Sequence, residues 1–292
     1  MNKLKTVIII IIVAGAFGAG VYFKDDVVKF YNGLNKQVQE FQKSDIGQTI
    51  SQLGKQVLTS SPLNVGGTSN KVVLLQSKII LETNLQRKEN GGLSALKENA
   101  KLNEAAMAKA NDMFLKQYFE HVSPSGVGPG DLAQEHGYDY IVEGENLILG
   151  NFASEKEVVQ DWMDSPGHRA NILNNRYTEI GVAIIKGTYK GGAVWIGVQE
   201  FGLPLSACSE PNSVLKNQID LEKSQLDDLS LEIGDKKNKI DNTNPKSAPY
   251  SQMIDDYNQL VVQYNSLAEK LKQNIAVYNI QINNFNNCVA GK

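Results

Sequence analysis

The stretch Ser165-Pro166-Gly167-His168-Arg169-Ala170-Asn171-Ile172-Leu173 places one of the chain's three histidines in a turn of small residues, just before an apolar pair. A second histidine has a similar setting in Tyr118-Phe119-Glu120-His121-Val122-Ser123-Pro124. Two short glutamate motifs, Gly144-Glu145-Asn146 and Thr178-Glu179-Ile180-Gly181, lie between and after them. Imidazole and carboxylate groups ligate zinc, and a carboxylate also serves as a general base. The residues that we expect to share one site are His121, Glu145, His168 and Glu179.

The residues around this stretch, 71–204, have the composition of a compact domain. Apolar residues recur at helical spacing in its first part and alternate near its end. The predicted helices are 79–87, 95–119 and 155–163, and the predicted strands of a β-hairpin are 179–186 and 193–201. Ser154 and Glu157 resemble a capping box at the start of the third helix. Helices followed by strands predict an α+β layered fold.

The N-terminal residues 6–23 form an unbroken run of apolar and small residues, preceded by Lys3 and Lys5. A helix of this length spans about 27 Å, close to the thickness of the hydrocarbon core of a bilayer. We expect residues 1–23 to form a single-pass membrane anchor, with the bulk of the chain outside the cytoplasm. A cleaved signal peptide is the alternative, because Ala14-Gly15-Ala16 offers a cleavage site, and the chain would then be secreted.

Residues 24–70 connect this segment to the compact domain. Apolar residues recur at helical spacing from Val27 to Val57, which predicts one or two amphipathic helices. Ser-Ser-Pro and Gly-Gly follow within 59–70 and predict a linker. We therefore interpret 24–70 as a helical spacer that ends in a linker.

The C-terminal residues 208–288 carry two apolar stripes with the spacing of a coiled-coil seam. The second stripe is Ile254, Tyr257, Val261, Tyr264, Ala268, Leu271, Ile275, Tyr278, Ile282 and Phe285. An Asn- and Pro-rich break at 242–249 predicts that the two helices fold back as an antiparallel hairpin. Cys208 and Cys288 lie about equally far from this turn, so folding brings them together, and we predict a disulfide at the base of the hairpin. Two free thiols are the alternative.

A series of ordered motifs between Thr83 and Phe201 resembles the CAP superfamily, which includes cysteine-rich secretory proteins, venom antigens and plant pathogenesis-related proteins. The resemblance is strongest to bacterial members, also called SCP-domain proteins. The residues that carry it are Asn84, Arg87, Gly91-Gly92-Leu93, Tyr118-Phe119, His121, Ser123-Pro124, Gly137-Tyr138, Gly144-Glu145-Asn146, Trp162-Met163, Ser165 to Leu173, Glu179 to Val182, Gln199 and Phe201-Gly202. One departure is Pro129-Gly130-Asp131, where bacterial relatives often carry Trp, and its loss suggests a more open cleft margin.

The resemblance implies a three-layer α-β-α sandwich with a central cleft. In the family, two histidines and two acidic residues in this cleft hold zinc or another divalent cation in some members. The matching positions here are His121, Glu145, His168 and Glu179, and we expect Asn146, Ser165 and Arg169 to line the cleft. For Asn146 a bond to the backbone, and for Arg169 a structural ion pair, are the more ordinary roles.

The composition also restricts the partners. A net charge of −3, without a basic stripe, argues against nucleic acid. We expect a membrane-anchored, non-catalytic binding module that holds a lipid, a divalent metal or another small ligand in the cleft, with a protein or cell-wall partner on the hairpin. The alternative function is a zinc-dependent hydrolase, in which a glutamate activates water on zinc bound by His121 and His168. A third interpretation is a tether whose His and Glu residues form only a buried polar network.

Overall fold

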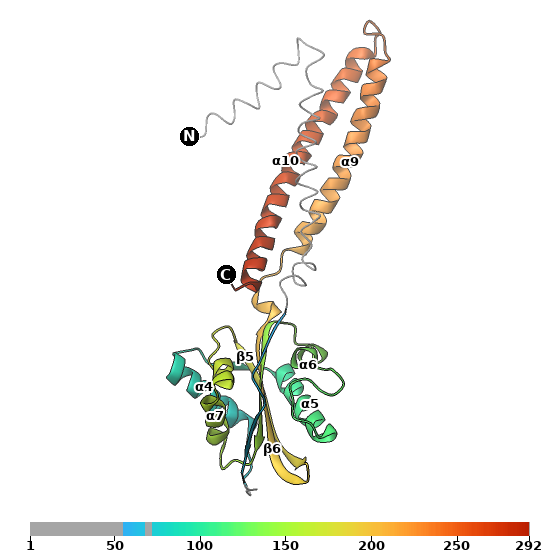
Figure 1. Cartoon of the computed structure of the whole chain (residues 1–292). Coiled ribbons are helices and arrows are strands. Elements are labelled where there is room, and N and C mark those ends of the chain that lie inside the picture. The colour runs from blue at the N-terminus through green and yellow to red at the C-terminus, as the bar shows by residue number, and fades with distance from the viewer. Residues whose placement is uncertain (1–54, 68–71, 292) are drawn as a thin grey trace. The chain divides into compact units, whose positions relative to one another are not determined.

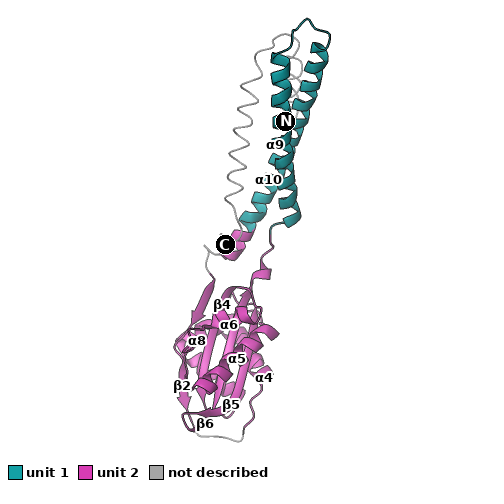
Figure 2. Ribbon diagram, turned by 90° about the vertical axis from the view of Figure 1, so that its right-hand side faces the viewer, with its two compact units in different colours: residues 1–48, 211–284 teal, residues 49–210, 285–292 magenta. Residues whose placement is uncertain are grey.

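The computed structural model describes residues 55–67 and 72–291. They divide into two compact units, Pro211–Asn284 and the described parts of Thr49–Glu210 with Phe285–Lys292 (Figure 2). The predicted membrane segment, 1–23, and most of the predicted helical spacer lie outside the described residues. Within the described ranges, no helix combines the length and the apolar character that crossing a membrane requires.

The larger unit is built on a mixed sheet of six strands. In chain order the strands are β1 (Gln56–Thr59), β2 (Leu63–Gly66), β3 (Lys97–Glu98), β4 (Tyr140–Gly150), β5 (Glu179–Tyr189) and β6 (Gly192–Pro204). Their order across the sheet is β1-β4-β6-β5-β3, and β2 also pairs with β4. The predicted hairpin is confirmed: Tyr189 pairs with Gly192 across a two-residue turn. Lys190 and Gly191 both have positive φ, as a turn with the right-handed strand twist requires.

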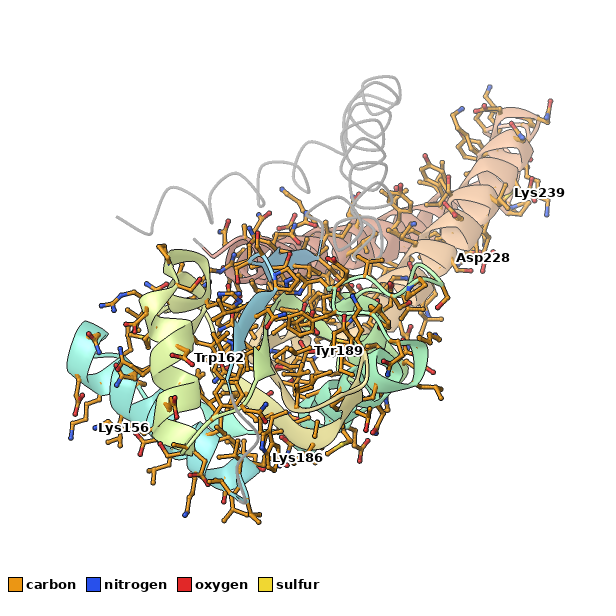
Figure 3. All side chains as sticks on the ribbon, turned by 60° about the horizontal axis from the view of Figure 1, so that its bottom comes forward. Lys156, Trp162, Lys186, Tyr189, Asp228 and Lys239 are labelled. Atoms are coloured by element: carbon orange, nitrogen blue, oxygen red, sulfur yellow. A yellow bond between two sulfur atoms is a disulfide. The ribbon has the colours of Figure 1, made fainter. Side chains whose placement is uncertain are left out.

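Helices cover both faces of this sheet, so the predicted α+β fold is confirmed and has three layers (Figure 1). The helices are α4 (Gln76–Gly91), α5 (Ala100–Lys116), α6 (Pro129–Glu135), α7 (Glu155–Asp164) and α8 (Pro166–Ile172). Helices α4 and α7 lie on one face, and α5 and α6 lie on the other. Helix α7 is amphipathic, as a helix that covers a sheet must be. Lys156 is exposed, whereas Trp162, on a different side of the helix, is fully buried; both are labelled in Figure 3.

The apolar core on the α5 face comes from alternate strand residues. Ala106, Ala110 and Met113 of α5 pack against Leu147 of β4 and Val198 of β6. Because Leu147 and Val198 are directly paired across the strands, they point to the same face. It follows that from Val142 onward the odd-numbered residues of β4 face α5 and the even-numbered ones face α4 and α7. A register shift before Val142 turns Tyr140 toward α5 and α6.

The first two strands differ from the prediction, which extended a helix to residue 58 and a linker over 59–70. Residues 56–59 instead pair in parallel with Val142–Glu145, and Leu63 pairs with Ile148. Pairing with β4 supplies the backbone hydrogen bonds that an isolated helix would make internally, so tertiary contact overrides the local apolar spacing. The more open cleft margin expected at Pro129-Gly130-Asp131 is not found at Gly130. A Cβ there would collide with Tyr140 Oη and with Val57 of β1, so the space beside Gly130 is already filled.

The smaller unit contains the long helix α9 (Ser213–Asp241) and most of α10 (Tyr250–Val289). As predicted, they form a helical hairpin, whose buried cluster includes Ile219, Leu226, Leu271 and Ile275. The residues labelled Asp228 and Lys239 in Figure 3 lie on the exposed surface of α9.

Glu222 interrupts the apolar stripe of α9 but is fully buried with its charge compensated. Lys270 lies 3.0 Å from it, and Gln218 and Asn274 donate hydrogen bonds of 2.9 and 2.8 Å to it. Burial alone would raise the pKa of Glu222, but these hydrogen bonds outweigh it and the pKa is lowered. The polar residue is therefore tolerated because both of its oxygens have partners.

The predicted disulfide is confirmed. Cys208 and Cys288 are bonded, with their Cα atoms 5.8 Å apart and a separation of 80 positions in the sequence. Cys208 precedes α9 and Cys288 lies in the last turn of α10, so the bond joins the ends of the helical hairpin. Closing a loop of this length removes about 4 kcal/mol of chain entropy from the unfolded state.

Candidate functional site

The candidate site is built around β4, at the edge where β1 and β2 pair with it. His121 comes from the loop after α5, and His168 comes from the first turn of α8. Glu145 belongs to the face of β4 that points toward α5, because Glu145 is two residues from Leu147 along the strand. The site thus draws on both helical layers and on the strand between them.

His121 is held at both ring nitrogens. Nδ1 lies 2.6 Å from Oε1 of the fully buried Glu145, and Nε2 bonds to the backbone carbonyl of Ser60. A carbonyl oxygen can only accept, so Nε2 carries a hydrogen, and a further proton lies between Nδ1 and the carboxyl group. The backbone of His121 is fixed as well, because Lys109 Nζ donates to its carbonyl at 2.5 Å.

His168 is more deeply buried, with 1% of its surface exposed. Its Nδ1 lies 2.8 Å from Ser165 Oγ, and its Nε2 has no full hydrogen-bond partner in the described part of the chain. Burial is the main cause that lowers the pKa of His168 to about 4, and the charge of His121 adds to the lowering. A backbone hydrogen bond with Leu147 opposes the lowering only in part, and His168 is therefore a neutral imidazole at pH 7.

Two asparagines tie these elements together. Asn146 Nδ2 donates to the backbone carbonyl of His168 at 3.2 Å, as the backbone-bonding role predicts. Asn171 Nδ2 lies 3.2 Å from the carbonyls of both Leu58 and Glu145, and 3.0 Å from Asn146 Oδ1. The two side chains fix α8 and the first strand against β4.

Beneath His121 lies a cluster of buried acids with one lysine. Glu143, Glu145, Glu200 and Lys109 are all fully buried, and Glu145 pairs directly with Glu200 across the strands. Burial raises the pKa of Glu143 to about 8, with the charge of Glu145 adding to the rise and a hydrogen bond with Glu200 opposing it. Burial, with the charges of Glu145 and Glu143 adding to it, raises the pKa of Glu200 well above its usual range. Burial also lowers the pKa of Lys109, although Glu145 and Glu200 oppose this. Glu143 and Glu200 are thus largely protonated at neutral pH.

Two residues predicted for the site lie away from it. Glu179 Oε2 accepts a 3.0 Å hydrogen bond from Asn99, which caps the start of α5. The whole of β6 separates β5 from β4, which places Glu179 about 10 Å or more from Glu145. Arg169 is exposed and donates to Asn90 Oδ1 at 3.2 Å, while the predicted cleft residues Asn146 and Ser165 do contact His168.

The arrangement can be tested for its fit to a metal ion. His168 Nε2 is a buried nitrogen without a full hydrogen-bond partner among the described residues, whereas Glu145 shares a hydrogen bond with Glu200. Both nitrogens of His121 are engaged, however, and Glu179 is held elsewhere. Within 55–67 and 72–291, no group of three or more His, Cys, Asp or Glu side chains is placed to hold a metal ion. The four predicted ligands therefore do not fit one ion as they are arranged here.

Comparison with known proteins gives consistent matches to the central part of the chain. Residues 82–201 match the model of the CAP family, the cysteine-rich secretory protein family. A stretch of 137 residues is 40% identical to "Uncharacterized protein YkwD" of Bacillus subtilis (strain 168), over 47% of this chain and 48% of that protein. A stretch of 120 residues is 32% identical to "Uncharacterized membrane protein YlbC" of the same organism, over 41% of this chain and 34% of that protein.

Among solved structures, an extracellular protein containing an SCP domain from Bacillus anthracis str. Ames is similar, with 28% identity and a TM-score of 0.38. That match covers 44% of this chain and 39% of the other. The chain thus spans about half or less of the length of the relatives it matches.

Proposed function

We propose that the chain, whose residues 82–201 match the model of the CAP family, is an extracytoplasmic binding module whose ligand contacts His121, Glu145 and His168. One observation carries this proposal: His168 Nε2 is buried near His121 and Glu145, and the hydrogen-bond geometry gives it no full partner among the described residues. Leaving a buried polar atom unbonded costs about 1–3 kcal/mol, so such atoms are uncommon in native proteins unless they serve a ligand or a reaction.

Two features support a place outside the cytoplasm. The Cys208–Cys288 disulfide suits an oxidising compartment. The apolar residues 6–23 suit either an anchor or a secretion signal. In this proposal the N-terminal segment holds the module at a membrane, and the α9–α10 hairpin offers its exposed flanks to a protein or cell-wall partner.

Hydrolysis on zinc receives no support from the geometry. That mechanism needs a free nitrogen on His121, and both nitrogens are bonded, one to Glu145 and one to Ser60. Binding of a divalent cation remains a separate proposal. Elemental analysis of the full chain after dialysis against zinc tests it, with a His121→Ala/His168→Ala variant as the control.

The experiment for the binding module uses the histidine ring resonances of the full chain. The protein has three histidines, and His136, which faces Glu104 at 3.6 Å, provides an internal reference. We would add soluble cell-wall fragments, short-chain lipids and unstructured peptides in turn. At least one class is expected to shift His121 and His168 while His136 stays unchanged. The proposal fails if no class does so, or if a class is chemically converted and the conversion is lost in His121→Ala.

A further inference from the structure

The site is covered by a segment of the chain itself, residues 56–66, which we call the cover segment. It runs parallel to β4 along the outer edge of the sheet. Pairing stops at Thr59 opposite Glu145 and resumes at Leu63 opposite Ile148, so Ser60, Ser61 and Pro62 cross the site without strand pairing. Every residue from 56 to 66 is at least partly exposed to solvent. The cover segment is therefore held mainly through its backbone.

Side chains from both helical layers bind that backbone. His121 donates from the α5 side to the carbonyl of Ser60, and Asn171 of α8 donates to the carbonyl of Leu58 at 3.2 Å. The backbone N–H of Asn151 also donates to Gly66 at 2.7 Å. Bonds to main-chain carbonyls recognise an extended polypeptide without selecting its sequence.

Glycines make the close approach of the cover segment possible. A Cβ at Gly167 would lie 2.7 Å from Ser60 Cβ, and its three nearest atoms all belong to Ser60. A Cβ at Gly150 would lie 2.5 Å from Val65 and 2.8 Å from the carbonyl of Gly66. The surface beside β4 is thus shaped to accept a polypeptide strand, with a small residue opposite Gly167.

We propose that the outer edge of β4, with His121 and Asn171, is a binding groove for an extended polypeptide strand. The cover segment is its resident occupant, and an incoming strand takes its place by pairing with β4. Exchange of this kind needs an occupant that leaves without disrupting the core, and the shallow burial of 56–66 meets that condition. This inference rests on the proposed function and names the ligand class of the same site.

The test pairs a substitution in the groove with a complementary change in a peptide. Gly167→Ala in the full chain places a methyl group against Ser60. Two fluorescent peptides of residues 55–67 are then compared by anisotropy, one with Ser60 and one with Ser60→Gly. The Gly167→Ala chain is expected to bind the Ser60→Gly peptide about tenfold more tightly than the Ser60 peptide. The wild-type chain should bind both weakly, because its own segment fills the groove.

The matched control is the double variant Gly167→Ala/Ser60→Gly. Its own segment fits the groove again, so peptide binding should return to the wild-type level. The proposal is overturned if the single variant binds neither peptide, if it binds both equally, or if the double variant binds as the single variant does. Gly167 is exposed in the first turn of α8, where alanine favours the helix, so the variant is expected to fold.

Hydrogen exchange of the wild-type chain tests the same inference without substitution. Amides in 57–66 are expected to open about 100-fold more often than those in 196–200 of β6. Equal protection would make the cover segment an integral part of the core and would overturn the inference. If a lipid or cell-wall fragment shifts His121 and His168 while the peptide experiment fails, the binding module stands and only its strand ligand is wrong.

Discussion

The two faces of β4 hold their buried polar groups in opposite ways. On the face toward α4 and α7, neutral side chains satisfy each other: Asn146 donates to Gln199 at 3.1 Å, and Gln199 donates to Thr83 at 2.7 Å. On the face toward α5, Glu143 and Glu200 are fully buried carboxyl groups, and burial raises the pKa of both. Amide networks in which every group has a hydrogen-bond partner make the core rigid, whereas buried carboxyl groups with raised pKa values are typical of functional sites.

The largest expected effect comes from removing the only lysine of the carboxyl cluster described above. Lys109→Met leaves Glu145 without its buried counter-charge and the carbonyl of His121 without its donor. We expect a loss of about 4 kcal/mol in the free energy of unfolding. Urea unfolding followed by tryptophan fluorescence measures it, because Trp162 and Trp195 are the only tryptophans and both lie within residues 82–201, which match the model of the CAP family.

Lys101→Met is the matched control, because Lys101 is exposed on the same helix. It should cost less than about 1 kcal/mol. Equal losses in the two variants would mean that the cluster does not depend on its lysine.

A substitution on the face of β4 toward α4 and α7 is expected to lower the free energy of unfolding slightly less. Asn146→Ala removes the side-chain donor to the His168 carbonyl and to Gln199 Oε1, and one of the acceptors of Asn171, which should lower the free energy of unfolding by about 3 kcal/mol. This loss should not change with pH, since none of these amides titrates. Urea unfolding at pH 6 and pH 8 checks both points, and a loss that depends on pH would contradict the separation of the two faces.

The buried carboxyl groups on the face of β4 toward α5 should make the free energy of unfolding depend on pH. The folded pKa of Glu143, about 8, lies above its unfolded value, so the folded state binds more protons and loses stability as pH rises toward 8. Above pH 6.5 the unfolded His168 is less than half protonated, so its opposing contribution fades as pH rises and the carboxyl groups become the main source. We expect a fall of about 1 kcal/mol per pH unit between 6.5 and 8, which Glu143→Gln reduces. A flat profile for the wild-type chain would contradict raised pKa values in this cluster.

The sequence predicts elements whose signals are local. Capping at Ser154, the Gly-rich turn before Gly192 and the stripe of α10 all carry their cause within a few residues, and each element formed as expected. The CAP motifs also identified His121, Glu145 and His168 as neighbours.

The remaining features depend on contacts between distant residues. β1 and β2 form by pairing with the edge of β4, and no sequence signal between 56 and 66 predicts that pairing. Glu143 and Glu200 look like exposed strand residues until α5 covers them, although a Glu-x-Glu repeat within a strand could have indicated two acids on one face. Glu179 lies on β5, beyond β6, and its carboxylate accepts a hydrogen bond from Asn99, neither of which the spacing of the motifs shows.

The most direct test of the account is the ring resonance of His121 in the full-length Gly167→Ala variant. The substitution pushes Ser60 away, and the His121 ring then loses its bond to the Ser60 carbonyl. We predict that the resonance of His121 moves, and that it returns to the wild-type position in Gly167→Ala/Ser60→Gly, while His136 stays unchanged throughout. An unchanged His121 resonance in the single variant would contradict a site that is covered by the chain's own strand.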